Sequence, residues 1–216
     1  MVLEYSLIAL LSPLVGGVIA AFFGKSMGKI FVNASTILGV MISFIFSCML
    51  AMDLYQTSAV FNQNLYTWID IGTFTFHIGL LIDNLTASMM VVVTFVSLMV
   101  HIYTIGYMHD DPGYHRFFAY ISLFTFSMLS LVMSNNFLQL FFGWEAVGVM
   151  SYLLIGFWYT KESAIKANLK AFLVNRVGDL SLILGIGIIF SITGSLDYQT
   201  AFSETQSLTQ TEFKLF

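Results

Sequence analysis

Charged side chains are scarce in this chain. Lys, Arg, Asp and Glu together make up 9% of its 216 residues, whereas soluble domains contain about a quarter. Hydrophobic residues make up 58%, and the mean hydropathy is +0.86. This balance excludes an ordinary soluble domain and predicts an integral membrane protein. The net charge of −4 comes from few groups, and no basic cluster points to a nucleic-acid partner.

Cysteine and metal-binding patterns are also scarce. The single cysteine, Cys48, lies in an apolar run, so the chain alone forms neither a disulfide framework nor a cysteine-ligated iron–sulfur site. The histidines show no ligand spacing such as H-E-x-x-H; they are His77, His101, His109 and His115. The glycines of residues 185–190 lie inside an apolar run with no preceding strand, which excludes a dinucleotide-binding loop. We therefore expect no metal and no redox cofactor in this chain.

Long apolar runs are abundant. Only two prolines are present, and the runs are far longer than a strand requires, which favours helices over a membrane β-barrel. The expected fold class is all-α, a polytopic bundle of about six transmembrane helices. The predicted spans are residues 6–23, 30–52, 80–105, 117–133, 135–159 and 171–193. Asp83 or Asn84 is expected to cap the third span, and Pro112 and Gly113 to separate it from the fourth.

The stretches outside these spans are polar. Residues 53–64 contain no Lys or Arg, and residues 73–78 alternate between apolar and polar side chains beside a turn predicted at residues 70–72. This period of two predicts a short β-hairpin, which we expect on the external face. Residues 194–216 are predicted to form an external polar segment with no closing element, and we expect the chain to be part of a longer protein.

The positive charges predict the topology. Six of the eight Lys and Arg residues lie in or beside the first, third and fifth connections between spans: Lys25, Lys29, Arg116, Lys161, Lys166 and Lys170. The second and fourth connections contain none. Because cytoplasmic loops collect Lys and Arg, we expect these three connections in the cytoplasm and the N-terminus in the periplasm.

Glu145 lies in a segment, residues 135–159, that is otherwise apolar enough to cross a bilayer. In a helix that begins at Asn135, Glu145 lies about 15 Å along the axis, close to the bilayer midplane. A charge there costs roughly 2.5–3.5 kcal/mol, and such a residue is a candidate functional group. We expect Glu145 to be protonated, paired or in contact with water inside the bundle. The alternative is a neutral glutamic acid that only fixes helix packing.

Three residues of the sixth span are further candidates. Asp179 lies about halfway along this span, and Arg176 precedes it by three residues on the same helix face. The two form either a structural ion pair or part of a proton relay, in which Arg176 tunes a neighbour because arginine keeps its proton. Lys170, near the cytoplasmic start, is either a solvated topology-setting residue or a proton-uptake group. His101 is interpreted as an interfacial, hydrogen-bonded histidine.

Several motifs resemble one family. FFGWEAVGVMSYLLIGFWY at residues 141–159 and KANLKAFLVNRVGD at residues 166–179 closely resemble the subunit L family, the largest antiporter-like membrane subunits of proton-pumping NADH:quinone oxidoreductase, complex I. LLIDNLTASMM, YTIGYMHDD and MSNNFLQLFFGWE fit the same family. The resemblance covers most of the chain from about residue 80 to residue 193. Subunits of cation/proton antiporters share the glutamate of the fifth helix.

The resemblance implies an architecture and a role for the candidate residues. The fold would be the N-terminal part of a module of two inverted five-helix repeats, of which the first runs from the fourth to the eighth helix. Glu145 would couple electrostatically to a lysine on the seventh helix, beyond residue 216, and Arg176 and Asp179 would belong to the charged motif of the sixth helix. Lys170 would stand at the cytoplasmic side of this proton relay.

The resemblance also implies a function. The chain would belong to a proton-translocating subunit that couples electron transfer from NADH to quinone to proton pumping, in a bacterial inner membrane. NADH, FMN, iron–sulfur clusters and quinone would bind to other subunits, and the partners would be other membrane subunits, lipid and protons. The alternatives are a subunit of a multi-subunit cation/proton antiporter and a structural membrane scaffold.

The chain divides into four expected segments. They are residues 1–79, with two transmembrane helices and the hairpin; residues 80–116, with the third helix and a cytoplasmic loop; residues 117–193, with helices four to six at the start of the antiporter-like repeat; and residues 194–216, the external polar segment.

Overall fold

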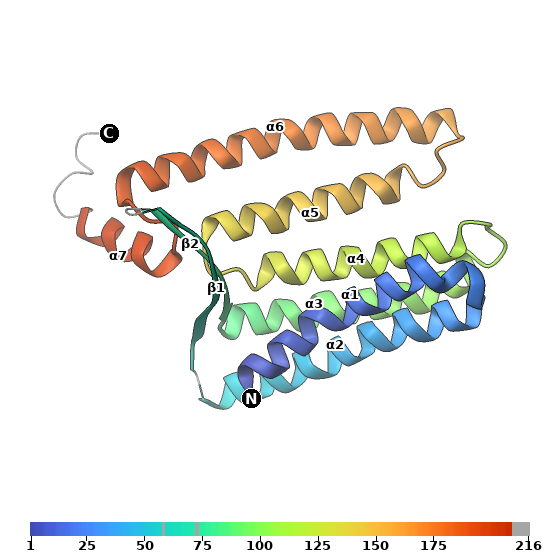
Figure 1. The fold of residues 1–216 in the computed structure, drawn as a ribbon, viewed down its shortest axis with the longest axis horizontal. Coiled ribbons are helices and arrows are strands. Elements are labelled where there is room, and N and C mark those ends of the chain that lie inside the picture. Colours follow the sequence, from blue (N-terminus) through green and yellow to red (C-terminus); the bar gives the residue numbers. More distant parts are fainter. Residues whose placement is uncertain (58, 72–73, 209–216) are drawn as a thin grey trace.

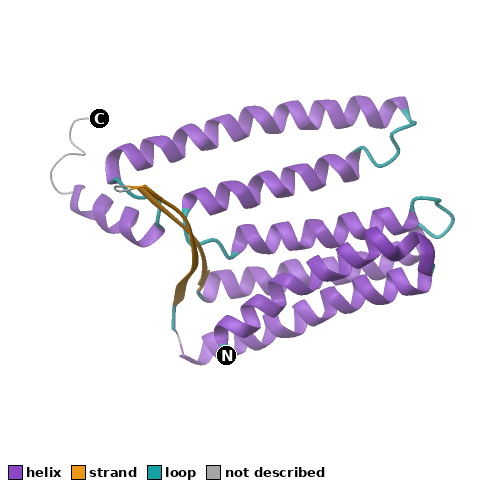
Figure 2. Cartoon of the chain, viewed as in Figure 1, coloured by secondary structure: helices purple, strands orange, loops and turns teal. Residues whose placement is uncertain are grey.

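Six long helices run up and down side by side, with a β-hairpin and a short helix at one end (Figures 1 and 2). The computed structural model describes residues 1–57, 59–71 and 74–208. Its elements are α1 (Val2–Met27), α2 (Lys29–Thr57), β1 (Phe61–Ile71), β2 (Phe74–Ile82), α3 (Asn84–Tyr107), α4 (Tyr114–Val132), α5 (Phe137–Ile155), α6 (Glu162–Thr193) and α7 (Tyr198–Leu208).

The helices α1 to α6 are each long and apolar enough to cross a membrane. The shortest, α4 and α5, have 19 residues, which corresponds to about 28 Å at 1.5 Å per residue and matches a hydrocarbon core of about 30 Å. The predicted fold class, an all-α polytopic membrane protein of about six spans with a small hairpin, is confirmed.

Some predicted helix boundaries were wrong. The third span was expected from residue 80, but residues 80–82 complete β2, and α3 begins after Asp83, whose carboxylate accepts a hydrogen bond of 2.7 Å from the Thr86 N–H. The fifth span was expected to reach residue 159, but α5 ends at Ile155 and turns follow. Hydropathy could not mark either boundary, because apolar side chains continue through the strand and the turns.

The hairpin is confirmed but is longer than predicted. Strands β1 and β2 pair antiparallel, with two register shifts. Residues 61–64 were expected in a polar loop and instead belong to β1. Of the predicted turn at residues 70–72, Asp70 and Ile71 belong to β1, and residue 72 lies outside the described residues.

The polar segment after the sixth span contains a helix that was not predicted. Gly194, with φ of 69° in the left-handed region, ends α6, and α7 follows from Tyr198. The Phe137 N–H donates to the Leu196 carbonyl at 3.0 Å, and the Tyr198 ring packs edge-on against Phe137 at 4.7 Å between centroids. These long-range contacts, rather than a local apolar pattern, hold the segment to the start of α5.

The hairpin is tied to the start of α5 by amide side chains. Asn136 caps α5 by accepting a hydrogen bond of 2.8 Å from the Gln139 N–H. The Gln139 amide accepts from the Gly79 N–H at 3.0 Å and donates to the Gly79 carbonyl at 2.9 Å, and the Asn135 amide donates to Asn64 at 2.7 Å. The N-terminal end of α5 is therefore held in a fixed position relative to the hairpin.

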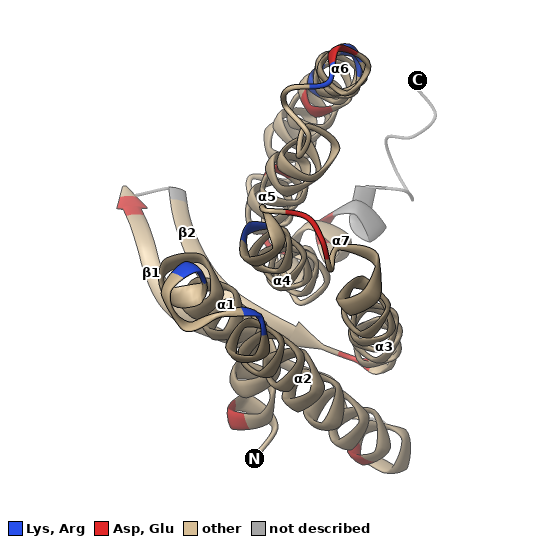
Figure 3. Ribbon diagram, turned by 90° about the vertical axis from the view of Figure 1, so that its right-hand side faces the viewer, with Lys and Arg blue, Asp and Glu red and all other residues tan. Residues whose placement is uncertain are grey.

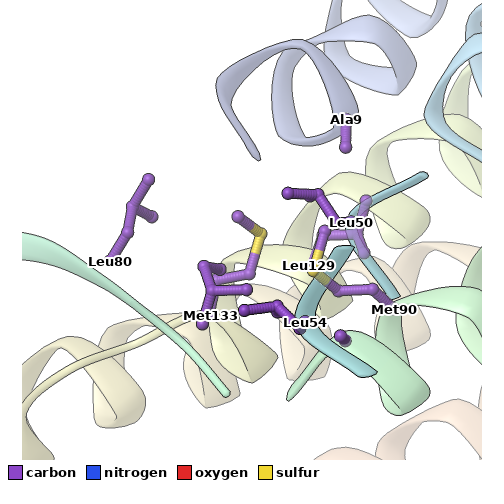
Figure 4. Close-up of a cluster of buried hydrophobic side chains, with 9 residues drawn as sticks. Ala9, Leu50, Leu54, Leu80, Met90, Leu129 and Met133 are labelled. Atoms are coloured by element: carbon purple, nitrogen blue, oxygen red, sulfur yellow. The ribbon is translucent and has the colours of Figure 1, made fainter. Parts of the chain in front are cut away.

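The main hydrophobic cluster lies where α1 to α4 meet β2 (Figure 4). Its buried residues are Ala9, Leu50, Leu54, Leu80, Ile82, Ala87, Met90, Leu129 and Met133. Helices α5 and α6 are less covered: the most apolar window of α5 is 6% buried and that of α6 is 11% buried, against 33% to 39% for the other four. In Figure 3, α4, α5 and α6 form a row that leads away from the bundle, with α6 at its edge.

His101 is hydrogen-bonded, as predicted, and lies between helices inside the bundle. Its side chain is fully buried in α3. The ring Nδ1 lies 2.8 Å from the Ser97 carbonyl, and Nε2 lies 2.9 Å from the Ser122 hydroxyl of α4. This pattern fits a neutral ring that donates through Nδ1 and accepts at Nε2. His101 therefore joins α3 to α4 inside the bundle.

Candidate functional site

Glu145 lies in the middle of α5, eight residues after Phe137 and ten residues before Ile155. At 1.5 Å per residue these intervals correspond to about 12 Å and about 15 Å along the helix axis. The carboxylate is too short to reach either membrane surface from that depth. Glu145 is 23% exposed, on the side of α5 that faces α6.

The structure places Glu145 in an ion pair with Arg176 of α6. The same guanidinium nitrogen, Nη1, lies 3.4 Å from Oδ2 of Asp179, one helical turn further along α6. Of the three states expected for Glu145, the structure therefore shows the paired one. The Arg176–Asp179 pair, which the sequence could not orient, faces α5.

Trp144 completes the cluster. Its indole Nε1–H donates a hydrogen bond of 2.8 Å to Oδ1 of Asp179. Asp179 is buried, with 10% of its side chain exposed, so the Trp144 hydrogen bond and the Arg176 ion pair replace much of its lost hydration. The Arg176 guanidinium also lies over the Phe172 ring, 4.7 Å from its centroid, at the distance of a cation–π contact. Trp144 and Phe172 were not predicted from the sequence as members of the site, although each lies within four residues of a candidate.

Helical spacing explains how α6 presents these groups. Phe172, Arg176 and Asp179 are separated by four and three residues, so their side chains project from one face of the helix. Gly143 brings α5 close to α4, because a Cβ at that position would lie 2.7 Å from the Leu131 Cα. A glycine at this crossing fixes α5, and with it Glu145, against the bundle.

Lys170 does not join this cluster. Its side chain is exposed, and the described part of the chain offers it no ion-pair or hydrogen-bond partner. Lys166 instead pairs with Glu162 at 2.7 Å, with both side chains largely exposed. Lys170 lies about 9 Å along α6 from Arg176, and its role in proton uptake stays a prediction.

Within the described residues, no group of three His, Cys, Asp or Glu side chains lies close enough together to hold a metal ion. The Glu145–Asp179 pair already shares a guanidinium. The arrangement can hold and exchange a proton between oxygen atoms near the membrane midplane. It contains no pair of groups arranged as a nucleophile and its base.

Comparison with known proteins identifies the family. The model for the N-terminus of chain 5 of NADH-ubiquinone oxidoreductase (complex I) matches residues 68–118, and the model for the NADH:quinone oxidoreductase/Mrp antiporter transmembrane region matches residues 134–215. NADH-quinone oxidoreductase subunit L of Neisseria meningitidis serogroup B is 55% identical over 215 residues, which is 98% of this chain and 32% of that protein. The chain belongs to the subunit L/chain 5 family of complex I.

Other members of the subunit L/chain 5 family also match nearly the whole of this chain. Subunit L of Rickettsia typhi is 44% identical over 96% of this chain and 32% of its own length. NADH-ubiquinone oxidoreductase chain 5 of Dictyostelium discoideum is 41% identical over 94% of this chain and 30% of its own length. The chain therefore spans about a third of the length of these relatives. The family resemblance inferred from the sequence motifs is confirmed.

A solved structure shares the fold of this subunit L/chain 5 family chain. It is a chain of the membrane-bound sulfane sulfur reductase, an archaeal respiratory membrane complex, with a TM-score of 0.76 and 16% identity. The match covers 89% of this chain and 38% of that chain. All four candidate residues lie in the region matched by the antiporter transmembrane model.

Proposed function

We propose that the chain is the N-terminal part of a membrane subunit that translocates protons in NADH:quinone oxidoreductase. The observation that carries the proposal is the cluster of Glu145, Arg176 and Asp179 at mid-depth of two membrane-spanning helices. Ionisable residues at such depth are costly and mark ion or proton pathways. The subunit L names of the relatives support the same assignment.

The chemistry of the cluster is an exchange of partners. Arg176 keeps its proton, while Glu145 and Asp179 compete for its guanidinium. If the guanidinium moves from 4 Å to 8 Å from one carboxylate, their attraction falls by about 2 kcal/mol at an effective dielectric constant of about 20. That change alters the proton-binding equilibrium of the carboxylate roughly 30-fold. A conformational signal that displaces Arg176 therefore favours proton uptake by that carboxylate, and its return favours proton release.

The proposal extends to the cofactors, the partner subunits and the membrane location. NADH, FMN, iron–sulfur clusters and quinone would bind to other subunits of the complex, and other membrane subunits would be its partners. The chain would lie in a bacterial inner membrane with a periplasmic N-terminus, because the six Lys and Arg residues of the first, third and fifth connections gather at one end of the molecule, seen end-on in Figure 3. Lys170 would serve proton uptake at that cytoplasmic end.

The test is Glu145→Gln in the full-length subunit, assembled in its complex and reconstituted in proteoliposomes. Gln keeps the shape but holds no exchangeable charge, so we expect proton pumping per NADH oxidised to fall several-fold while the complex stays assembled. The matched control is Glu162→Gln, because Glu162 is 81% exposed at the start of α6. Unchanged pumping in Glu145→Gln would refute the relay role.

The second candidate is a subunit of a cation/proton antiporter. It is favoured by the family model that matches residues 134–215, whose description includes the Mrp antiporter. Co-purification separates the two functions: peripheral flavin and iron–sulfur subunits indicate complex I, and small membrane subunits alone indicate the antiporter. A purely structural scaffold predicts that Glu145 never changes its ionisation during turnover, which infrared difference spectroscopy measures.

A further inference from the structure

Three buried polar atoms of α4 and α6 have no hydrogen-bond partner among the described residues. They are Nε of Arg116, Oδ1 of Asn168 and Nε of Arg176. A buried polar group left unpaired costs about 1–3 kcal/mol, and lipid offers no replacement partner. Two of these atoms are donors and one is an acceptor. Water is the small molecule that satisfies both kinds of group.

A cavity connects two of the three side chains. It has a volume of about 410 Å³, lies where the cytoplasmic ends of α4, α5 and α6 meet, and is lined by Arg116, Tyr120, Tyr152, Gly156 and Asn168, among others. At about 30 Å³ per molecule of liquid water, a space of this size holds on the order of ten waters. Asn168 is itself 9% exposed, so its amide belongs to the protein interior rather than to the surface.

From this cavity a polar line follows the seam between α5 and α6. The two helices meet in an antiparallel register with the contacts Gly156–Asn168, Tyr152–Phe172, Gly148–Asn175, Glu145–Arg176 and Trp144–Asp179. Each asparagine of α6 thus faces a glycine of α5: a Cβ at Gly156 would lie 2.3 Å from the Asn168 amide nitrogen, and one at Gly148 would lie 3.6 Å from that of Asn175, which is exposed. From Asn168 to Arg176 the distance along the helix axis is about 12 Å.

One aromatic contact interrupts the polar line. The rings of Tyr152 and Phe172 meet edge to face, with centroids 5.3 Å apart, between the positions of Asn168 and Asn175. Phe172 also touches the Arg176 guanidinium. The aromatic pair therefore separates the cavity from the ionised cluster and contacts both sides.

We propose that water in the cavity at Arg116 and Asn168 delivers protons along the α5–α6 seam to the Glu145–Arg176 pair, with Tyr152 and Phe172 as the constriction. The proposal rests on the proposed function, since it names the route by which the site exchanges protons with the cytoplasm. Asn168 acts as a positioning residue for water and does not exchange a proton itself.

The route is tested by cysteine accessibility in the full-length subunit within its complex. Asn168→Cys and Asn175→Cys are placed in a background without native cysteines, including Cys48→Ser, and membrane vesicles with the cytoplasmic face outward are treated with a membrane-impermeant methanethiosulfonate. The matched controls are Leu169→Cys and Val174→Cys, adjacent residues that are 57% and 64% exposed and do not face α5. NADH:quinone electron transfer verifies assembly of each variant.

We expect Asn168→Cys to react at least tenfold faster than Val174→Cys. Asn175→Cys should react slowly until Tyr152→Ala opens the constriction, and then at least tenfold faster, whereas Tyr152→Ala should leave the rate at Val174→Cys unchanged. The route is refuted if Asn175→Cys with Tyr152→Ala reacts no faster than Val174→Cys, or reacts only from the opposite membrane face.

A second measurement, proton pumping, tests the route without the cysteine variants. Asn168→Leu removes the amide at nearly constant volume, and we expect pumping to fall several-fold, with recovery in Asn168→Gln. Equal pumping in Asn168→Leu and the wild type would also refute the route. Labelling is measured without turnover, so a failed labelling pattern refutes the route alone, whereas normal pumping by Glu145→Gln refutes the proposed function.

Discussion

Removing the cation from the cluster should force a carboxyl group to take up a proton. The guanidinium Nη1 of Arg176 lies 3.4 Å from Oδ2 of Asp179 and pairs with Glu145 on its other side. At an effective dielectric constant of about 20, one contact at this distance contributes an attraction of about 5 kcal/mol. Arg176→Gln removes this attraction for both carboxylates and leaves two like charges near each other.

Protonation of one carboxyl group costs less free energy than keeping both carboxylates ionised. A free glutamate with an ordinary pKa of about 4.3 is protonated at pH 7 at a cost of about 4 kcal/mol, and at pH 6 of about 2 kcal/mol. The lost attraction of about 5 kcal/mol exceeds both values, although solvent reaches part of Arg176, which is 37% exposed. We therefore expect one protonated carboxyl group in Arg176→Gln, with an occupancy that rises as the pH falls from 8 to 6. Arg176→Lys keeps a cation and should remain ionised.

Infrared difference spectroscopy of the assembled complex measures this proton through the carbonyl stretch of a protonated carboxyl group. The double variant Arg176→Gln/Glu145→Gln removes one of the two candidates and should weaken the new band, because Asp179 then has no like-charged neighbour and keeps the Trp144 hydrogen bond. A band of equal intensity in Arg176→Lys, or no band in Arg176→Gln at pH 6, would contradict the electrostatic reasoning.

Two further predictions concern other parts of the fold. Gly156→Ala places a Cβ 2.3 Å from the Asn168 amide nitrogen and should lower the free energy of unfolding by about 1–3 kcal/mol through overpacking. Gly106→Ala, whose Cβ would meet no atom within 4 Å, should not lower it. Equal denaturation midpoints of the two variants would contradict this prediction. Burial raises the pKa of Tyr198 above 10.0, against a smaller opposing effect of its hydrogen bond with Ser134. The stabilising contribution of Tyr198 is therefore complete below pH 10 and is lost as the pH rises further. Tyr198→Phe should remove a tyrosinate absorbance that appears only above pH 10. Loss of a tyrosinate absorbance that appears at or below pH 10 would contradict this prediction.

The membrane-spanning helices were predictable because hydropathy dominates in long apolar runs. Residues 117–133 were expected as a span, and α4 runs from Tyr114 to Val132. Hydropathy failed where the same apolar composition serves a strand, as at residues 80–82, and where tertiary contacts hold a polar segment, as in α7. Propensity and period describe only local structure, and these two elements depend on partners distant in sequence.

The candidate site was predictable in part. Glu145 is conspicuous because a carboxylate in a bilayer needs a partner, and the spacing of Arg176 and Asp179 put both on one helix face. Their orientation toward α5 depends on the register between the two helices, which no single-helix pattern contains. Trp144 could have been noticed as an indole donor beside a buried acid, but only the fold brings it to Asp179.

The charge balance of the cluster links its structure to the proposed function. With both carboxylates ionised, Glu145, Arg176 and Asp179 carry one net negative charge at mid-depth of the helices. Such a charge is expensive in a bilayer unless a proton or a second cation neutralises it. A bound proton and a nearby cation thus neutralise the same negative charge, so the presence of one makes the other less favourable. Because the two effects are reciprocal, a cation that approaches Glu145 favours loss of a proton from the cluster, and withdrawal of that cation favours proton uptake.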